Sequence, residues 1–274
     1  EHLASALACR RLDALIMSAA APTRRLRVLV ACPPREEHAF GLLSLTFLLR
    51  RRGMAVVYLG ADVPRDQMEA TLESTQPHLG GMAAQRLPTA ASLLEMAQML
   101  CQQDVPLGFG GLVFNLLPDL QTRIPGHFLG ETLEGAVQTI EQVLTAPQSL
   151  ENPGSARRDY REALVHLRER QSLVEAHLWG WLDGLELPHS VAATAIEHLI
   201  DDIAAALALG DLDLLGADIE WVRGLLANHG LPEDGRHLFL KTFGQALRRN
   251  LDERGQPIVA WLERGDACGT CLPA

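Results

Sequence analysis

The sequence lacks any apolar run of the roughly 20 residues that a helix needs to span a bilayer. It also lacks a secretory signal pattern, in which a basic start precedes an apolar stretch and a small-residue cleavage site. Its five cysteines are an odd number, and only Cys268 and Cys271 lie close together, so a disulfide framework is not indicated. We therefore expect a protein of a reducing, cytoplasmic compartment with no membrane partner. The role of Cys268 and Cys271 stays open.

Positive charge is also scarce. The 24 Lys and Arg residues are outnumbered by 34 Asp and Glu residues, and the net charge of −10 argues against direct nucleic-acid binding. The imbalance is uneven, because residues 1–147 have a net charge of −2 and residues 148–274 one of −8. No nucleophile elbow, P-loop or metalloprotease helix is present. The sequence therefore predicts two domains and favours a function other than catalysis.

The first half of the chain alternates short apolar runs with amphipathic stretches. After an amphipathic helix over 2–18, we expect strands at 27–32, 55–59, 79–84, 106–109 and 127–129. The helices expected between and after them are 39–52, 66–75, 89–103, 118–123 and 132–144. This order predicts an α/β domain over 23–147, with a doubly wound, five-stranded parallel sheet covered by helices on both faces. Ligands of such sheets bind beyond the carboxyl ends of the strands.

The second half shows no strand pattern. Residues 148–156 have the composition of a linker, and residues 157–274 form an all-helical domain in this interpretation. The helices are expected at about 157–185, 190–209, 213–228, 233–252 and 257–263.

One loop of the first domain has the composition of a metal site. Glu36, His38 and Gly41 follow the first strand as Glu-x-His-x-x-Gly. A histidine can offer one ring nitrogen to a metal while the other donates to a carboxylate, which fixes the tautomer. Glu36 is placed to be that carboxylate, and Gly41 leaves room for a bulky ligand beside the helix. The alternative is a surface histidine in a polar loop.

These residues resemble the cobalamin-binding domain family, which has a flavodoxin-like fold. The family signature is an Asp-x-His-x-x-Gly loop, a later Ser-x-Leu strand end and a Gly-Gly pair after the fourth strand. Glu36, His38 and Gly41 match the first part, with Glu in place of Asp, and Gly110 and Gly111 match the last. The resemblance covers about residues 25–145 and includes the stretches 27–32, 56–60 and 124–130.

The resemblance implies that His38 is the lower axial ligand of cobalt, in place of the cofactor's own base. The displaced nucleotide tail would then pass Gly41 and lie beside Gly110 and Gly111. The Ser-x-Leu position falls near Met82-Ala83-Ala84, which has no hydroxyl group. We expect a contact from the Ala83 backbone or from Gln85 to take its place.

Within that family, the stretches 48–53 and 57–64 resemble the light-responsive branch of CarH-type photoreceptors. That branch has a helical cap marked by Trp, nine residues and then Glu-His. Glu1 and His2 match its end, so residues 1–22 are interpreted as the last cap helix, with the rest of the cap preceding residue 1. The resemblance implies adenosylcobalamin as cofactor, cleavage of its cobalt–carbon bond by light, and a homo-oligomer, dimer or tetramer, that changes with light.

The helical domain contains all four tryptophans and six of the ten histidines. One interpretation is a dimerisation bundle. Another is a pocket for biliverdin in a globin-like domain, since the domain order resembles the photocobilins. A linear tetrapyrrole needs aromatic walls and polar partners for its pyrrole and propionate groups. The candidates are His177, Trp181, His198, Trp221, Arg236 and His237. Haem is a further possibility.

Three functions therefore compete. The first is a cobalamin-dependent photosensory module. The second is a corrinoid carrier for a separate methyltransferase, because 274 residues with a helical tail cannot also contain a barrel of the usual size. The third is a cobalamin-sensing regulator without photochemistry.

Overall fold

The chain forms two compact units, residues 1–154 (unit 1) and 155–274 (unit 2). The structure is a computed structural model that describes residues 2–146, 156–182 and 187–267. Glu1, most of the expected linker, and the Cys268–Cys271 pair lie outside these residues, and so does the side chain of His2. Each unit is described by itself.

Unit 1 contains the expected parallel sheet. Its strands are β1 (Arg27–Ala31), β2 (Ala55–Gly60), β3 (Leu79–Ala83), β4 (Leu107–Gly110) and β5 (His127–Phe128). All neighbours pair in parallel, and the spatial order is β2-β1-β3-β4-β5. The prediction of a doubly wound five-stranded sheet is confirmed. The strand order reverses between β1 and β3, which is where such a sheet forms a binding crevice.

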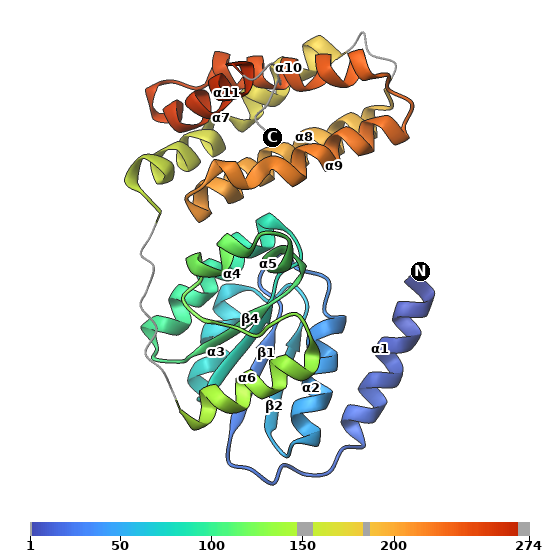
Figure 1. The fold of residues 1–274 in the computed structure, drawn as a ribbon, viewed down its shortest axis with the longest axis vertical. Helices are drawn as coiled ribbons and strands as arrows, with labels where there is room; N and C mark the ends of the chain where they lie inside the picture. The colour runs from blue at the N-terminus through green and yellow to red at the C-terminus, as the bar shows by residue number, and fades with distance from the viewer. Residues whose placement is uncertain (1, 147–155, 183–186, 268–274) are drawn as a thin grey trace. The chain divides into compact units, whose positions relative to one another are not determined.

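Helices cover both faces of this sheet (Figure 1). Helices α2 (Phe40–Arg51) and α6 (Leu133–Thr145) pack on one face, and α3 (Arg65–Thr75), α4 (Leu87–Gln102) and α5 (Leu112–Leu116) lie on the other. The core under α2 and α6 includes Val28, Leu45, Val56 and Ile140, all nearly inaccessible to solvent. Helix α5 is too short to give a periodic pattern, and the sequence did not predict it. The helix expected at 118–123 is a 3-10 helix, η1 (Pro118–Arg123).

Strand β3 has the weakest strand composition, Leu-Gly-Gly-Met-Ala. Glycine is normally unfavourable inside a strand because it has no side chain to pack. Here the lack of a side chain is needed, because a Cβ at Gly80 would lie 2.5 Å from Cδ2 of Leu100 in α4. The glycine lets that leucine reach the strand.

Helix α1 (His2–Met17) precedes the sheet and lies beside α2 (Figure 1). Ile16 is buried, and Arg50 donates from Nη1 to the Ile16 carbonyl at 3.1 Å and from Nη2 to the Val56 carbonyl at 3.4 Å. Arg50 therefore ties the end of α1 to α2 and β2. Leu7, Leu15 and Met17 stay exposed on α1.

Unit 2 consists of helices joined by short turns over its described residues, 156–182 and 187–267, and has no strand there. Its α-helices are α7 (Arg158–Leu182), α8 (His189–Leu209), α9 (Gly216–Asn228), α10 (Glu233–Asn250) and α11 (Gln256–Ala267). Short 3-10 turns, η2 (Leu212–Leu215) and η3 (Glu253–Gly255), join some of them. Ala195, Val222, Phe239 and Trp261 contribute to its buried interior. Among the described helices of the chain, none combines the length and the apolarity that crossing a membrane requires.

Candidate functional site

The site lies at the carboxyl edge of the sheet, where β1, β3 and β4 end next to one another. Ala31 pairs with Met82, and Ala83 pairs with Gly110. The loops that follow these strands therefore begin side by side. They bring Glu36 and His38 together with Gln85, Gly110 and Gly111, which are far apart in the sequence.

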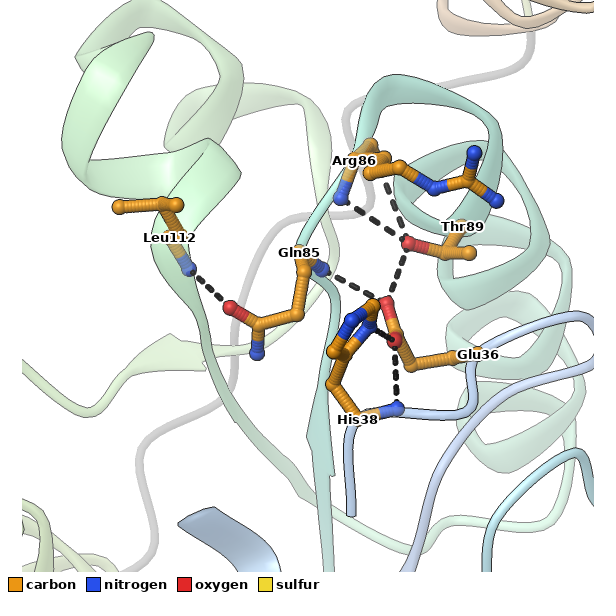
Figure 2. Close-up of polar contacts among 6 residues, drawn as sticks. All are labelled: Glu36, His38, Gln85, Arg86, Thr89 and Leu112. Atoms are coloured by element: carbon orange, nitrogen blue, oxygen red, sulfur yellow. Dashed lines mark hydrogen bonds and ion pairs between the residues drawn. The ribbon is translucent and has the colours of Figure 1, made fainter. Parts of the chain in front are cut away.

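Glu36 is the centre of this arrangement, and its side chain is only 1% exposed. Its Oε1 accepts hydrogen bonds from the His38 backbone N–H at 2.9 Å and from the ring Nδ1 of His38 at 2.8 Å. Its Oε2 accepts from the Gln85 backbone N–H at 2.8 Å and from the Thr89 hydroxyl at 2.7 Å (Figure 2). The buried carboxylate therefore joins the β1–α2 loop to the start of α4.

The electrostatics of Glu36 favour its ionised form. Burial by itself would raise the pKa of a carboxyl group, because it penalises the charge. The hydrogen bonds from Thr89, the His38 and Gln85 backbones and the His38 ring outweigh that penalty, so the pKa of Glu36 lies below its ordinary value of 4.5. At neutral pH the carboxylate can only accept hydrogen bonds.

His38 has a buried side and an open side. Its side chain is 69% exposed, yet its Nδ1 atom is held by Glu36. Because Glu36 is ionised, Nδ1 carries the proton and donates it to the carboxylate, which leaves the lone pair of Nε2 available to a metal. Figure 2 shows the ring lying against the Glu36 carboxylate. The pairing expected from the sequence is the one that the structure contains.

A second loop fixes the backbone around Glu36. Arg35 and Asp62 both have positive φ, at 67° and 46°. The Arg35 N–H donates to Oδ1 of Asp62 at 2.7 Å, and the Asp62 N–H donates to the Glu36 carbonyl at 2.9 Å. Non-glycine residues rarely adopt this conformation, and these two hydrogen bonds hold it in place. Sequence reasoning missed Asp62, although an aspartate just after a strand end was a usable signal.

Comparison with known proteins bears on the whole of unit 1. Residues 26–137 match the B12 binding domain family. Two curated relatives are the HTH-type transcriptional repressors CarA and CarH of Myxococcus xanthus, 38% identical over 119 residues and 32% identical over 135 residues. Unit 1 contains a B12-binding domain. The matched regions are 41% and 48% of this chain but only 40% and 45% of the repressors, so the chain spans less than half of their length.

Two solved structures are also similar. One is the methanol:cobalamin methyltransferase complex MtaBC from Methanosarcina barkeri, with 24% identity and a TM-score of 0.43 over 49% of this chain and 52% of that one. The other is a cobalamin-binding protein from Desulfitobacterium hafniense, with 18% identity and a TM-score of 0.38 over 43% of this chain and 59% of that one.

The glycines of the B12-binding domain differ in how much space a side chain would have at each position. A Cβ built at Gly41 or at Gly110 meets no atom within 4 Å. At Gly111, φ is +117° and a Cβ would lie 2.0 Å from the Ala84 carbonyl oxygen. Gly111 is therefore required by the protein's own backbone. Gly41 and Gly110 are not, because a side chain at either position would extend into open space.

We expect Gly111→Ala to lower the stability of unit 1 by about 3 kcal/mol or more, since it combines a strained φ with a backbone clash. Gly110→Ala is the matched control and should change stability by less than about 1 kcal/mol. Far-UV circular dichroism during urea unfolding measures both. Tryptophan fluorescence reports the unfolding of unit 2 alone, because all four tryptophans lie there. The urea midpoint that it measures should be the same in both variants. Equal stability of the two variants would contradict this assignment.

Two groups of Gln85 are already used within the protein, which narrows the contact that it was expected to make with a nucleotide tail. The Gln85 backbone N–H is used by Glu36, and its side-chain oxygen accepts from the Leu112 N–H at 3.1 Å (Figure 2). The Ala84 N–H donates to the Gly110 carbonyl at 3.0 Å, and Ala83 is half-buried at the end of β3. The expected contact from Gln85 to a nucleotide tail therefore concerns its side-chain NH₂ group.

Sequence reasoning also missed four exposed apolar residues near the carboxyl edge of the sheet, which we call the apolar rim. Phe40, Leu112, Leu116 and Leu133 are 49%, 51%, 63% and 40% exposed. They lie in α2, α5 and α6, the helices that follow β1, β4 and β5, so all four stand near the carboxyl edge. Large exposed apolar groups next to a binding crevice are typical of a site for a ligand with apolar surfaces. The available Nε2 atom, the open glycines and this rim together fit a corrinoid.

The six candidates for a second chromophore are only partly brought together. The rings of His198 and Trp221 stack at 4.1 Å, and Nε2 of His198 lies 3.0 Å from Oδ2 of the buried Asp202. His177 instead contacts Asn250, with 3.0 Å between Nδ1 and Nδ2. Arg236 donates to the Leu231 carbonyl and pairs with Glu233. Trp181 is 44% exposed, and His237 is an exposed residue of α10.

Proposed function

We propose that this chain is a cytoplasmic sensory module that binds adenosylcobalamin, with His38 as the lower axial ligand of cobalt and with light as its signal. One observation carries the cobalamin part of the proposal. The exposed imidazole of His38, at the switch point of the sheet, donates from Nδ1 to the buried, ionised carboxylate of Glu36. This orients Nε2 as a metal ligand.

Each element of the site has a task in this proposal. Glu36 sets the tautomer of His38, and Thr89 and Gln85 hold Glu36. Gly41 and Gly110 line the way for the nucleotide tail, and the apolar rim contacts the corrin ring. Bound adenosylcobalamin supplies a cobalt–carbon bond that light can break.

A sensory role is favoured over an enzymatic one. The sequence contains no recognised catalytic motif, and the two curated relatives are named as transcriptional repressors. The sequence resemblance to CarH-type photoreceptors supports light as the signal and a light-dependent change of homo-oligomeric state as the output. In this proposal α1 is the last helix of a cap over the upper face of the corrin.

Illumination of the reconstituted protein tests the proposal. In the dark we expect an adenosylcobalamin spectrum, and after green light a spectrum of cobalamin without its carbon ligand, together with a changed elution volume in size-exclusion chromatography. Methyl transfer from bound methylcobalamin to a partner, with no response to light, would instead indicate a corrinoid carrier. Binding without any light response would indicate a regulator without photochemistry.

The second part of the proposal is a biliverdin site in unit 2. The stacked His198–Trp221 pair offers an aromatic wall, and the buried Asp202 carboxylate beside it suits pyrrole N–H donors. A red absorption band in protein supplied with biliverdin would support the site. A Soret band would indicate haem. The absence of both bands would favour the interpretation of unit 2 as a dimerisation bundle.

A further inference from the structure

Unit 1 has a cavity at the end of the domain opposite His38. It has a volume of about 720 Å³ and lies between the last turn of α1, the segment that follows it, and the last turn of α2. Four arginines line it, Arg24, Arg50, Arg51 and Arg52, together with Leu15 and Phe47. We call this cavity the arginine groove.

The arginine groove is separate from the cobalamin site. The N–H groups of Thr23 and Arg24 donate to the Gly53 carbonyl at 2.9 Å each, and Gly53 lies just before β2 begins. The groove is therefore at the amino edge of the sheet. Glu36 and His38 lie at the carboxyl edge, so the assignment of cobalamin does not account for the four arginines.

Positive charge in the groove exceeds what its contacts neutralise. Arg24 and Arg52 share one carboxylate, with Nη1 atoms 2.9 and 3.0 Å from the two oxygens of Glu141. Arg50 donates to carbonyl oxygens, and the Arg51 guanidinium lies 5.7 Å from the centre of the Phe47 ring. Four guanidinium groups therefore meet one carboxylate, a local charge of +3 in a chain whose net charge is −10.

Helix capping explains only part of this arrangement. Cations in the last turn of a helix complement its dipole, as Arg50 and Arg51 do for α2, and Arg50 also donates to the Ile16 carbonyl at the end of α1. Arg24 is not in a helix, and Arg51 is exposed with its guanidinium over an aromatic ring. Guanidinium groups that converge on one carboxylate have the geometry that also recognises phosphate.

We propose that the arginine groove binds an organic polyphosphate of nucleotide size. Arg24, Arg51 and Arg52 would hold the phosphoryl groups, and the apolar part of the ligand would lie against Leu15 and Phe47. The volume is within the range of small-molecule sites. The proposal is independent of the cobalamin site and of light.

Isothermal titration of the full chain at low salt, with ATP and with inorganic tripolyphosphate as probes, tests this proposal. Arg51→Gln should weaken ATP binding about tenfold, because it removes one charge-assisted contact. Glu141→Gln should tighten binding several-fold, because it removes the carboxylate that competes for Arg24 and Arg52. Arg158→Gln, an exposed arginine of unit 2 paired with Glu162, is the control and should change nothing.

The two probes separate the parts of the ligand. ATP binding at least tenfold tighter than tripolyphosphate supports a role for the apolar wall, whereas equal affinity would restrict the site to phosphoryl groups and overturn the organic part. The proposal would be overturned if neither ATP nor tripolyphosphate binds. It would also be overturned if Arg51→Gln and Arg158→Gln weaken ATP binding equally. Binding only to a DNA duplex, lost in Arg51→Gln, would replace it with a nucleic-acid contact.

Discussion

Replacing His38 by alanine is expected to abolish the absorption spectrum of histidine-ligated cobalt while leaving the fold intact. The ring is 69% exposed and makes one side-chain hydrogen bond, to Glu36, which keeps three other donors. The loss of stability should therefore be below about 1 kcal/mol. The cobalt, in contrast, loses its only proposed protein ligand.

Two controls make this result specific. His78→Ala removes another exposed histidine of unit 1, whose Nδ1 accepts from the Arg27 N–H, and it should keep the ligated spectrum. Added imidazole should restore the ligated spectrum in His38→Ala, because the small base can occupy the place of the missing ring. A His38→Ala protein that keeps the spectrum of the unchanged protein would show that the ligand has been wrongly assigned.

Replacing Glu36 by alanine is expected to cost unit 1 about 3 kcal/mol or more, because several donors lose their acceptor in a buried place. These donors are the Gln85 and His38 backbone N–H groups and the Thr89 hydroxyl. The measurement is urea unfolding followed by circular dichroism. Glu37→Ala is the matched control, since Glu37 is exposed and adjacent, and it should change stability by less than about 0.5 kcal/mol.

The contribution of Glu36 should also depend on pH. Its pKa is lower in the folded chain than the ordinary value of 4.5, so ionised Glu36 stabilises the fold. The stabilisation is fully present above pH 4.5 and is lost as the pH falls below that value and through the folded pKa. Glu36→Gln, which keeps the shape without the charge, should lose this part of the pH dependence. Superimposable pH profiles of the two proteins would contradict the role given to Glu36.

Much of unit 1 followed from patterns that are local in the sequence. The apolar run Val28-Leu29-Val30 and the alternation of strand and helix were enough to predict the doubly wound sheet. The Glu36–His38 pair was found because both residues lie in one loop. Strand β3 was predicted despite its two glycines, but the reason for Gly80 is the close packing of Leu100 from α4, a contact that the sequence does not reveal.

The rest of the site depends on contacts that a single sequence does not reveal. Thr89 is 53 residues from Glu36 in the sequence, so the pattern of the first loop does not reveal the hydrogen bond from its hydroxyl to Glu36. Asp62 and Leu112 reach the site from other loops because the parallel sheet gathers strand ends at one edge. The cap interpretation of Glu1 and His2, the domain boundaries and the second chromophore stay predictions.

The central claim is that the histidine nitrogen at position 38 binds cobalt. Electron paramagnetic resonance of bound cob(II)alamin, in protein whose histidines carry nitrogen-15, addresses it directly. The account predicts that each cobalt line splits into a doublet, from one labelled protein nitrogen, and that the doublet disappears in His38→Ala. A triplet, from the unlabelled base of the cofactor itself, would contradict the account.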